Sequence, residues 1–157
     1  MKHFAAALAL LLPLTVYAGF NEGVQAYERG DYAKAIAEFK PLAERGNAKA
    51  QYSMGYLYHY GYGVSRDETQ AVKWFRLAAD QGDALSQYYL GLIYENGKDV
   101  GRDLVAAHMW FSLSASNAPG YRDKLDAKQK AAELEHRMSK EQISQAAQMA
   151  QNWKPEK

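Results

Sequence analysis

Apolar and polar residues in the middle of this chain follow the spacing of paired α-helices. Ala71, Trp74, Phe75 and Ala78 are separated by offsets of three, four and seven, and residues 52–58 show a similar spacing. Such offsets place side chains on one face of a helix rather than on a strand. The pattern therefore predicts two amphipathic helices, joined by a polar, glycine-containing loop.

The whole pattern returns 36 residues later, because Gly46 to Leu77 matches Gly82 to Leu113 without a gap. Self-similarity at a fixed period of about 20–50 residues is typical of stacked repeat proteins. The matched positions that we assign to packing, capping and helix ends are Tyr52, Gly55, Tyr58, Gly61, Asp67, Ala71, Trp74 and Gly82, with copies at Tyr88, Gly91, Tyr94, Gly97, Asp103, Ala107 and Trp110.

Short polar residues and glycines mark the ends of the predicted helices. Asn47 and Asp83 precede the first helix of each repeat, and Asp67 and Asp103 precede the second, so all four are expected N-caps. Gly61, Gly82 and Gly97 follow helices, where glycine accepts left-handed geometry. Asp67 with Gln70, and Ser139 with Gln142, have the spacing of capping boxes.

Gly55 and Gly91 fall inside predicted helices, where glycine costs about 1 kcal/mol relative to alanine. A cost that is repeated indicates a packing requirement that is repeated. We expect a close approach of two helices at each glycine, with the bulk of a tryptophan from the partner helix filling the space.

The repeat is incomplete at both ends. Upstream, Asp31 and Phe39 match Asp67 and Phe75, whereas Tyr27 matches Tyr58 at a spacing of 31, so the loop of this first copy is five residues shorter. Downstream, residues 118–157 predict two helices that cap the stack. The predicted units are a shortened repeat at 19–45, full repeats at 46–81 and 82–117, and the cap at 118–157.

Residues 1–18 have the organisation of a secretory signal peptide. Lys2 and His3 precede an apolar run, and Val16-Tyr17-Ala18 provides small residues at the two positions that a signal peptidase reads. The apolar run is too short to span a bilayer of about 30 Å. We therefore expect an exported mature chain that begins at Gly19, is periplasmic or secreted, and has no stable membrane insertion.

Composition narrows the possible partners. The formal net charge is +1, which gives no electrostatic reason to expect nucleic acid. The chain has no cysteine, which excludes disulfides and thiolate metal sites and suits a bacterial periplasm. No nucleophile, general base or phosphate-binding loop has the required spacing. The sequence predicts a non-enzyme without a cofactor or metal.

The repeated residues resemble the Sel-one-like repeat (SLR), a 36-residue relative of the tetratricopeptide repeat. The similarity is carried by Ala-x-Ala-Gln-Tyr-x-Met-Gly-x-Leu-Tyr at 48–58, followed by Gly61-Tyr62-Gly63-Val64, Arg66-Asp67, Ala71, Trp74-Phe75, Ala78-Ala79 and Gly82. The second copy departs from it at Asp99, where a glycine is expected; aspartate also accepts left-handed geometry, so the loop should be kept. The resemblance implies an all-α superhelix (solenoid) of antiparallel helix pairs and an adaptor or scaffold that binds other proteins, in bacteria often in the cell envelope.

One stripe on the first helix of each repeat is not part of the shared motif. In helical solenoids the first helices line the concave surface, and tyrosine suits binding surfaces because it combines a large rigid area with a polar tip. These residues are therefore the candidate contacts for an extended segment or loop of another protein, with packing against the next repeat as the alternative. They are Lys49, Ser53, Tyr56, Tyr60, Leu85, Tyr89, Leu92 and Asn96.

Other chemistry-bearing residues have simpler interpretations. His59, His108 and His136 lack metal-ligand spacing and are expected to be surface residues. Arg66 and Arg102 are expected to hold their loops by hydrogen bonds. The function predicted is a non-catalytic interaction adaptor; the alternatives are a module that binds peptidoglycan or another envelope glycan through aromatic faces, and a cell-wall hydrolase.

Overall fold

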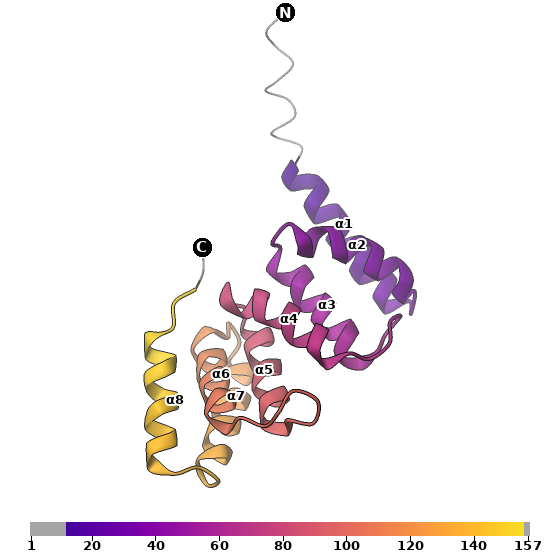
Figure 1. The fold of residues 1–157 in the computed structure, drawn as a ribbon. Helices are drawn as coiled ribbons and strands as arrows, with labels where there is room; N and C mark the ends of the chain where they lie inside the picture. Colours follow the sequence, from indigo (N-terminus) through magenta and orange to yellow (C-terminus); the bar gives the residue numbers. More distant parts are fainter. Residues whose placement is uncertain (1–11, 156–157) are drawn as a thin grey trace, which may run out of the picture.

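The computed structural model describes the backbone of residues 12–155 and the side chains of residues 19–155. Within this range all regular secondary structure is α-helical and there is no strand, which confirms the all-α prediction (Figure 1). The helices are α1 (Leu12–Glu28), α2 (Tyr32–Glu44), α3 (Ala48–Tyr60), α4 (Glu68–Asp80), α5 (Ala84–Asn96), α6 (Leu104–Asn117), α7 (Tyr121–Glu135) and α8 (Lys140–Asn152).

From α1 to α7, consecutive helices pack against each other, so the chain is a stack of antiparallel pairs, α1/α2, α3/α4 and α5/α6, as predicted for a solenoid (Figure 1). Both C-terminal helices pack against α6. The first helices α3 and α5 also contact each other directly. The side of the stack lined by the first helices is the one predicted to be concave.

The predicted signal peptide is largely outside the described residues. Only the backbone of residues 12–18 is described, as the beginning of α1. No helix in the described part of the chain is long and apolar enough to cross a membrane.

The predicted helix ends are confirmed. The side chains of Asn47, Asp67, Asp83 and Asp103 each accept a hydrogen bond from the backbone N–H three residues later. Gly61 and Gly97 are left-handed C-caps, with φ of 73° and 64°. The Ser139–Gln142 capping box is complete. At Asp67 only half of the predicted box forms: the backbone N–H of Gln70 donates to Asp67, and no return bond is made.

The helix glycines do mark close approaches, but the prediction of tryptophan as the partner was wrong. A Cβ added to Gly55 would lie 2.6 Å from the ring of Phe75, and at Gly91 it would lie 2.6 Å from Phe111. The phenylalanine of each second helix is fully buried over this glycine. Trp74 and Phe75 are adjacent on α4, so they leave the helix in directions about 100° apart. Only one of them can face the glycine.

The same contact also corrects the alignment of the first repeat. A Cβ on Gly23 would meet Phe39, as Gly55 meets Phe75, which gives a spacing of 32 for the first helices. Asp31 closes its loop by donating its backbone N–H to Ala26, whereas Asp67 donates to Tyr58. The first loop is therefore four residues shorter rather than five, and Tyr27 corresponds to His59.

The loop of the second repeat differs from the expectation for Asp99. No described residue other than glycine has a positive φ, and the left-handed position of this loop is Gly101, with φ of 81°. The loop still closes by the bond from the Asp103 N–H to the Tyr94 carbonyl, at 3.0 Å. Glycine takes the left-handed position because it has no Cβ to clash there.

In each of the two full repeats, one buried glutamine connects the repeat with the one before it. The side chain of Gln51 donates to the carbonyl of Ala43 at the end of α2, and Gln87 donates in the same way to Ala79 at the end of α4. Gln81 and Asn117 donate to the carbonyl oxygens of these two glutamine side chains. These bonds satisfy the amide groups of the two buried glutamine side chains, which would be costly to leave unpaired.

Candidate binding site

The concave side carries an open hollow of about 350 Å³ between α1, α3 and α5. We call it the aromatic hollow. Four tyrosines contribute half of its lining, and Phe39 of α2, which is almost completely buried, belongs to its inner wall. The lining residues are Val24, Tyr27, Phe39, Tyr52, Ser53, Tyr56, Leu57 and Tyr89.

Tyr56 lies at the centre of this arrangement. Its ring is nearly perpendicular to the rings of Tyr27 and Tyr89, with centroids 6.1 and 5.7 Å away. Its centroid is also 6.0 Å from that of Tyr52 and 4.5 Å from that of Tyr60. Edge-to-face and tilted contacts of this kind are favourable for aromatic rings. They hold the tyrosines in fixed orientations before any ligand arrives.

A second set of rings extends from the hollow along the loop between α3 and α4. Tyr62 is stacked between Tyr32 and Tyr60, at centroid distances of 4.9 and 5.7 Å. Tyr60 is 44% exposed, so the end of this stack is open to solvent.

The aromatic hollow is electrically neutral. It has no lysine, arginine, histidine, aspartate or glutamate in its lining. Burial, with a smaller effect from neighbouring Tyr56, raises the pKa of Tyr52 to about 12. Burial also raises the pKa values of Tyr27 and Tyr89, with further contributions from Tyr56 and Tyr60, respectively. Near neutral pH the hydroxyl groups are therefore protonated and can both donate and accept hydrogen bonds.

The eight residues of the predicted stripe lie in several separate places. Ser53, Tyr56 and Tyr89 line the aromatic hollow, and Tyr60 contacts it through Tyr56. Leu85 lines a smaller hollow between α5, α6 and α7. Leu92 and Asn96 line a polar hollow described below, and Lys49 is exposed outside all three.

Sequence reasoning missed three aromatic members of the hollow. Tyr27 and Phe39 were assigned only to the repeat alignment, and Tyr52 was assigned to packing. Tyr52 does pack, against Phe75 at 5.9 Å, but it also lines the hollow. The available signal was the shortened first loop, which brings Tyr27 of α1 beside α3.

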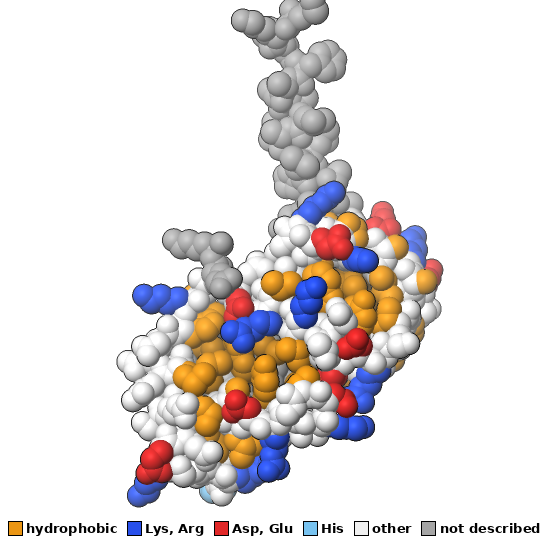
Figure 2. All heavy atoms as spheres, viewed as in Figure 1, with side chains coloured by type: hydrophobic (Ala, Val, Ile, Leu, Met, Phe, Trp, Pro, Cys, Tyr) orange, Lys and Arg blue, Asp and Glu red, His pale blue; other side chains and the backbone are white. Residues whose placement is uncertain are grey.

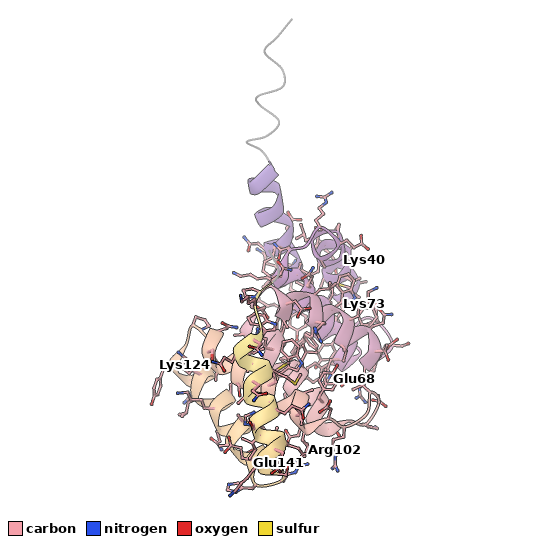
Figure 3. The ribbon with its side chains drawn as sticks, turned by 60° about the vertical axis from the view of Figure 1, so that its left-hand side comes forward. Lys40, Glu68, Lys73, Arg102, Lys124 and Glu141 are labelled. Atoms are coloured by element: carbon pink, nitrogen blue, oxygen red, sulfur yellow. The ribbon has the colours of Figure 1, made fainter. Side chains whose placement is uncertain are left out.

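The polar hollow lies at the C-terminal end of α5, with Glu68 and Arg102 on the same side of the molecule (Figure 3). Glu68 is buried, and its Oε2 lies 3.0 Å from Nδ1 of His59 and 3.6 Å from Nη2 of Arg66. Arg66 also donates to the carbonyl of His59, so it holds its loop as predicted. Its copy Arg102 forms no hydrogen bond or ion pair within the described residues, so this part of the prediction was wrong.

The interpretation of His59 and His108 as surface residues was also wrong. His59 is half-buried against Glu68, and His108 is 5% exposed. Nε2 of His108 lies 3.1 Å from Oε1 of Glu135, which connects α6 with α7. These polar contacts satisfy ring nitrogens that burial would otherwise leave unpaired. His136 is exposed, as expected.

Residues 12–155 contain no group of three or more His, Asp or Glu side chains placed to hold a metal ion. On the face shown in Figure 2, hydrophobic side chains gather in two areas, one over the α1–α3 part and one over α4–α6, with charged side chains between them. The arrangement that combines a defined hollow with an aromatic lining is therefore the candidate binding site.

Comparison with known proteins places this fold in a family. Residues 48–83 and 84–118 match the Sel1 repeat. The crystal structure of a Sel1 repeat protein from Oxalobacter formigenes superposes with a TM-score of 0.63 at 31% identity, covering 79% of this chain and 96% of that one. This chain belongs to the Sel1 repeat family. Members of this family are generally scaffolds for protein–protein interactions.

Two other relatives are much longer than this chain. A protective antigen of uropathogenic Escherichia coli strains, which has an SLR fold, superposes with a TM-score of 0.81 at 31% identity, covering 88% of this chain and 29% of the antigen. The "DAP3-binding cell death enhancer 1" of Rattus norvegicus is 37% identical over 72 residues, which is 45% of this chain and 14% of the rat protein. The chain thus spans less than a third of either relative.

Proposed function

We propose that this Sel1 repeat protein is an exported, non-catalytic adaptor of the bacterial cell envelope, and that it holds an extended segment or loop of another protein in the aromatic hollow. The observation that carries this proposal is the open, tyrosine-lined hollow on the concave side of the stack. Its volume of about 350 Å³ lies within the range of known ligand pockets, which is roughly 300–1,000 Å³.

Tyrosine is well suited to this task. It buries a large area with only two side-chain torsions to fix, and its hydroxyl can pair with a peptide backbone. The rings of the hollow already brace one another, so ordering them on binding costs little entropy. Export is supported by the signal-peptide pattern of residues 1–18 and by the absence of cysteine from the sequence.

The test is affinity purification from a bacterial envelope extract with the parent chain and a Tyr56→Ala variant. The matched control is Tyr121→Ala, because Tyr121 is 83% exposed on α7 and lines none of the hollows. We expect the parent and the control to capture the same protein and Tyr56→Ala to lose it, with all three showing similar circular dichroism. Equal capture by Tyr56→Ala would exclude the aromatic hollow as the binding site.

Export has its own test. Fractionation of cells that produce the full chain should place the protein in the periplasm or medium, with an N-terminal sequence that begins at Gly19. Recovery of the intact chain from the cytosol would contradict this part of the proposal.

Envelope glycan is the second candidate ligand, because the Tyr32–Tyr62–Tyr60 stack ends in an exposed flat ring on which a sugar could stack. A pull-down on purified sacculi distinguishes the two candidates. A protein adaptor stays in the supernatant, whereas a glycan-binding module sediments with the wall. In the second case the Tyr60→Ala variant should no longer sediment.

A further inference from the structure

The aromatic hollow lies where one repeat lacks a side chain that the next repeat has. Ser53 and Tyr89 are equivalent positions, 36 residues apart, on the first helices α3 and α5. The ring of Tyr89 is stacked on Phe75 of the preceding repeat, with centroids 5.1 Å apart and planes within 13°. Phe39 is the equivalent of Phe75, but Ser53 and Phe39 only line an open hollow.

Two other contacts of these phenylalanines are alike in the two repeats. Phe20 contacts Phe39 at 5.4 Å and 45°, and Tyr52 contacts Phe75 at 5.9 Å and 45°. The glycine contacts described above are also the same. The repeats differ at position 53, where the serine hydroxyl turns back to bond the carbonyl of Lys49 at 2.9 Å. They also differ at Val24, Tyr27 and Tyr56 of the hollow, which correspond to Tyr56, His59 and Leu92 in the next repeat. The hollow corresponds to the place of the missing ring.

We propose that the bound segment inserts one aromatic side chain, a tyrosine or phenylalanine, into the aromatic hollow and so completes the repeat from outside. The ring takes beside Ser53 the place that Tyr89 takes in the next repeat. This inference rests on the proposed function, in which the hollow holds a segment of another protein.

The lining favours a neutral ring over other side chains. A lysine or arginine in the hollow would lose water without a carboxylate to pair with, because no charged group lines it. A tyrosine or phenylalanine would meet the rings of Tyr27, Tyr56 and Tyr89 in the lining, and aromatic pairs gain stability in edge-to-face and offset-stacked contacts. A tyrosine hydroxyl would also meet protonated hydroxyls with which it can bond.

The first experiment uses p-cresol, the side chain of tyrosine, as the probe for the unmodified protein. In a ¹⁵N NMR titration at pH 7 we expect saturable shifts of the Ser53 and Tyr56 amides with a Kd on the order of 1 mM, a value usual for so small a ligand. Butylammonium and 3-methylbutanol represent lysine and leucine, and each should bind at least about tenfold more weakly than p-cresol. The inference would be overturned if either of these two compounds bound as tightly as p-cresol, or if p-cresol shifted only amides outside the hollow.

The second experiment fills the hollow from within. Ser53→Tyr should place its own ring where we expect the partner's ring, weaken p-cresol binding at least about tenfold, and raise the melting temperature. Lys49→Tyr adds a ring one turn away, outside the hollow, so this control should bind p-cresol as the parent does. Unchanged p-cresol binding by a folded Ser53→Tyr variant would contradict the assignment.

Capture from envelope extract separates this inference from the function on which it rests. If Ser53→Tyr abolishes capture but p-cresol does not bind the parent, the hollow is the partner site and the aromatic occupant is wrong. If p-cresol binds in the hollow but capture is unaffected by Ser53→Tyr and Tyr56→Ala, the proposed function fails, and the inference about its occupant fails with it.

Discussion

At the scale of single residues, glycine and phenylalanine form the contact that holds each helix pair together. The contact is repeated three times, at Gly23, Gly55 and Gly91, each of which faces a buried phenylalanine of the partner helix. An interior glycine is unfavourable for an isolated helix, so the close packing must offset this cost. The repeated glycine is therefore a requirement of the pair and not of the helix.

Gly55→Ala should consequently destabilise the protein, although alanine is the better helix former. The new Cβ would lie 2.6 Å from the ring of Phe75, and overpacking of this kind typically costs about 1–3 kcal/mol, against a propensity gain of up to about 1 kcal/mol. We expect a net loss of about 1–2 kcal/mol in the free energy of unfolding, measured by urea denaturation. The double variant Gly55→Ala/Phe75→Leu should show a coupling between the sites; an additive loss would count against the contact.

At the scale of helices, the tyrosines of the aromatic hollow join α1, α3 and α5 into one neutral cluster. Their raised pKa values mean that the folded protein keeps its phenolic protons at pH values where the unfolded chain loses them. The cluster therefore links stability to alkaline pH.

The stability contributed by this protonation is fully present below pH 10, the usual pKa of tyrosine. It is lost as the pH rises from about 10 towards 12, the value to which the pKa of Tyr52 is raised, because only the unfolded state releases protons there. Melting temperatures should fall steeply across this window, and Tyr52→Phe should reduce the fall. Tyr121→Phe, at an exposed site, should leave it unchanged. A melting temperature that does not change across this pH window would show that the tyrosines of the cluster titrate as they do in water.

The buried glutamines make the second connection between helices. Gln87→Leu would remove the bond to the Ala79 carbonyl, which keeps its bond from the Gly82 N–H, and the bond from the exposed Asn117 amide. Hydrogen bonds of this kind contribute about 0.5–1.5 kcal/mol each. We expect a loss of this size in the free energy of unfolding. The control Gln145→Leu, at an exposed position of α8, should change it by less than about 0.5 kcal/mol. Equal effects of the two substitutions would show that the bonds of Gln87 add no stability.

At the scale of the whole molecule, the two last helices protect the end of the stack. α8 packs on α6, where Ala150 and Trp153 contact a cluster that includes Met109, Trp110 and Leu113. These three residues of α6 are at most 7% exposed. Repeat stacks need such terminal covers to remain soluble.

Ending the chain after Met138 should therefore expose apolar surface on α6. We expect a lower melting temperature and self-association, measured by size-exclusion chromatography with light scattering. A milder variant, Trp153→Ala, should lower the melting temperature but have the same molar mass in solution as the parent. A truncated chain with unchanged stability and mass would show that α8 does not cover the stack.

The sequence alone determined which parts of the chain form helices and where these begin and end. Caps such as Asn47 and Asp83, left-handed glycines and offsets of three and four act within one or two helical turns, so they are visible in one dimension. The 36-residue period adds that the pairs are alike and must stack. The interaction role followed from the family resemblance.

Only the tertiary structure decided which side chains meet. Tyr27, Phe39 and Tyr89 line one hollow although as many as 62 positions separate them, a juxtaposition produced by the stacking of three repeats. The same stacking selected Phe75 over its neighbour Trp74 as the partner of Gly55, because rotation about the helix axis allows one of the two to face the glycine. A local pattern fixes the face of a helix, but what that face contacts depends on the neighbour that packs against it.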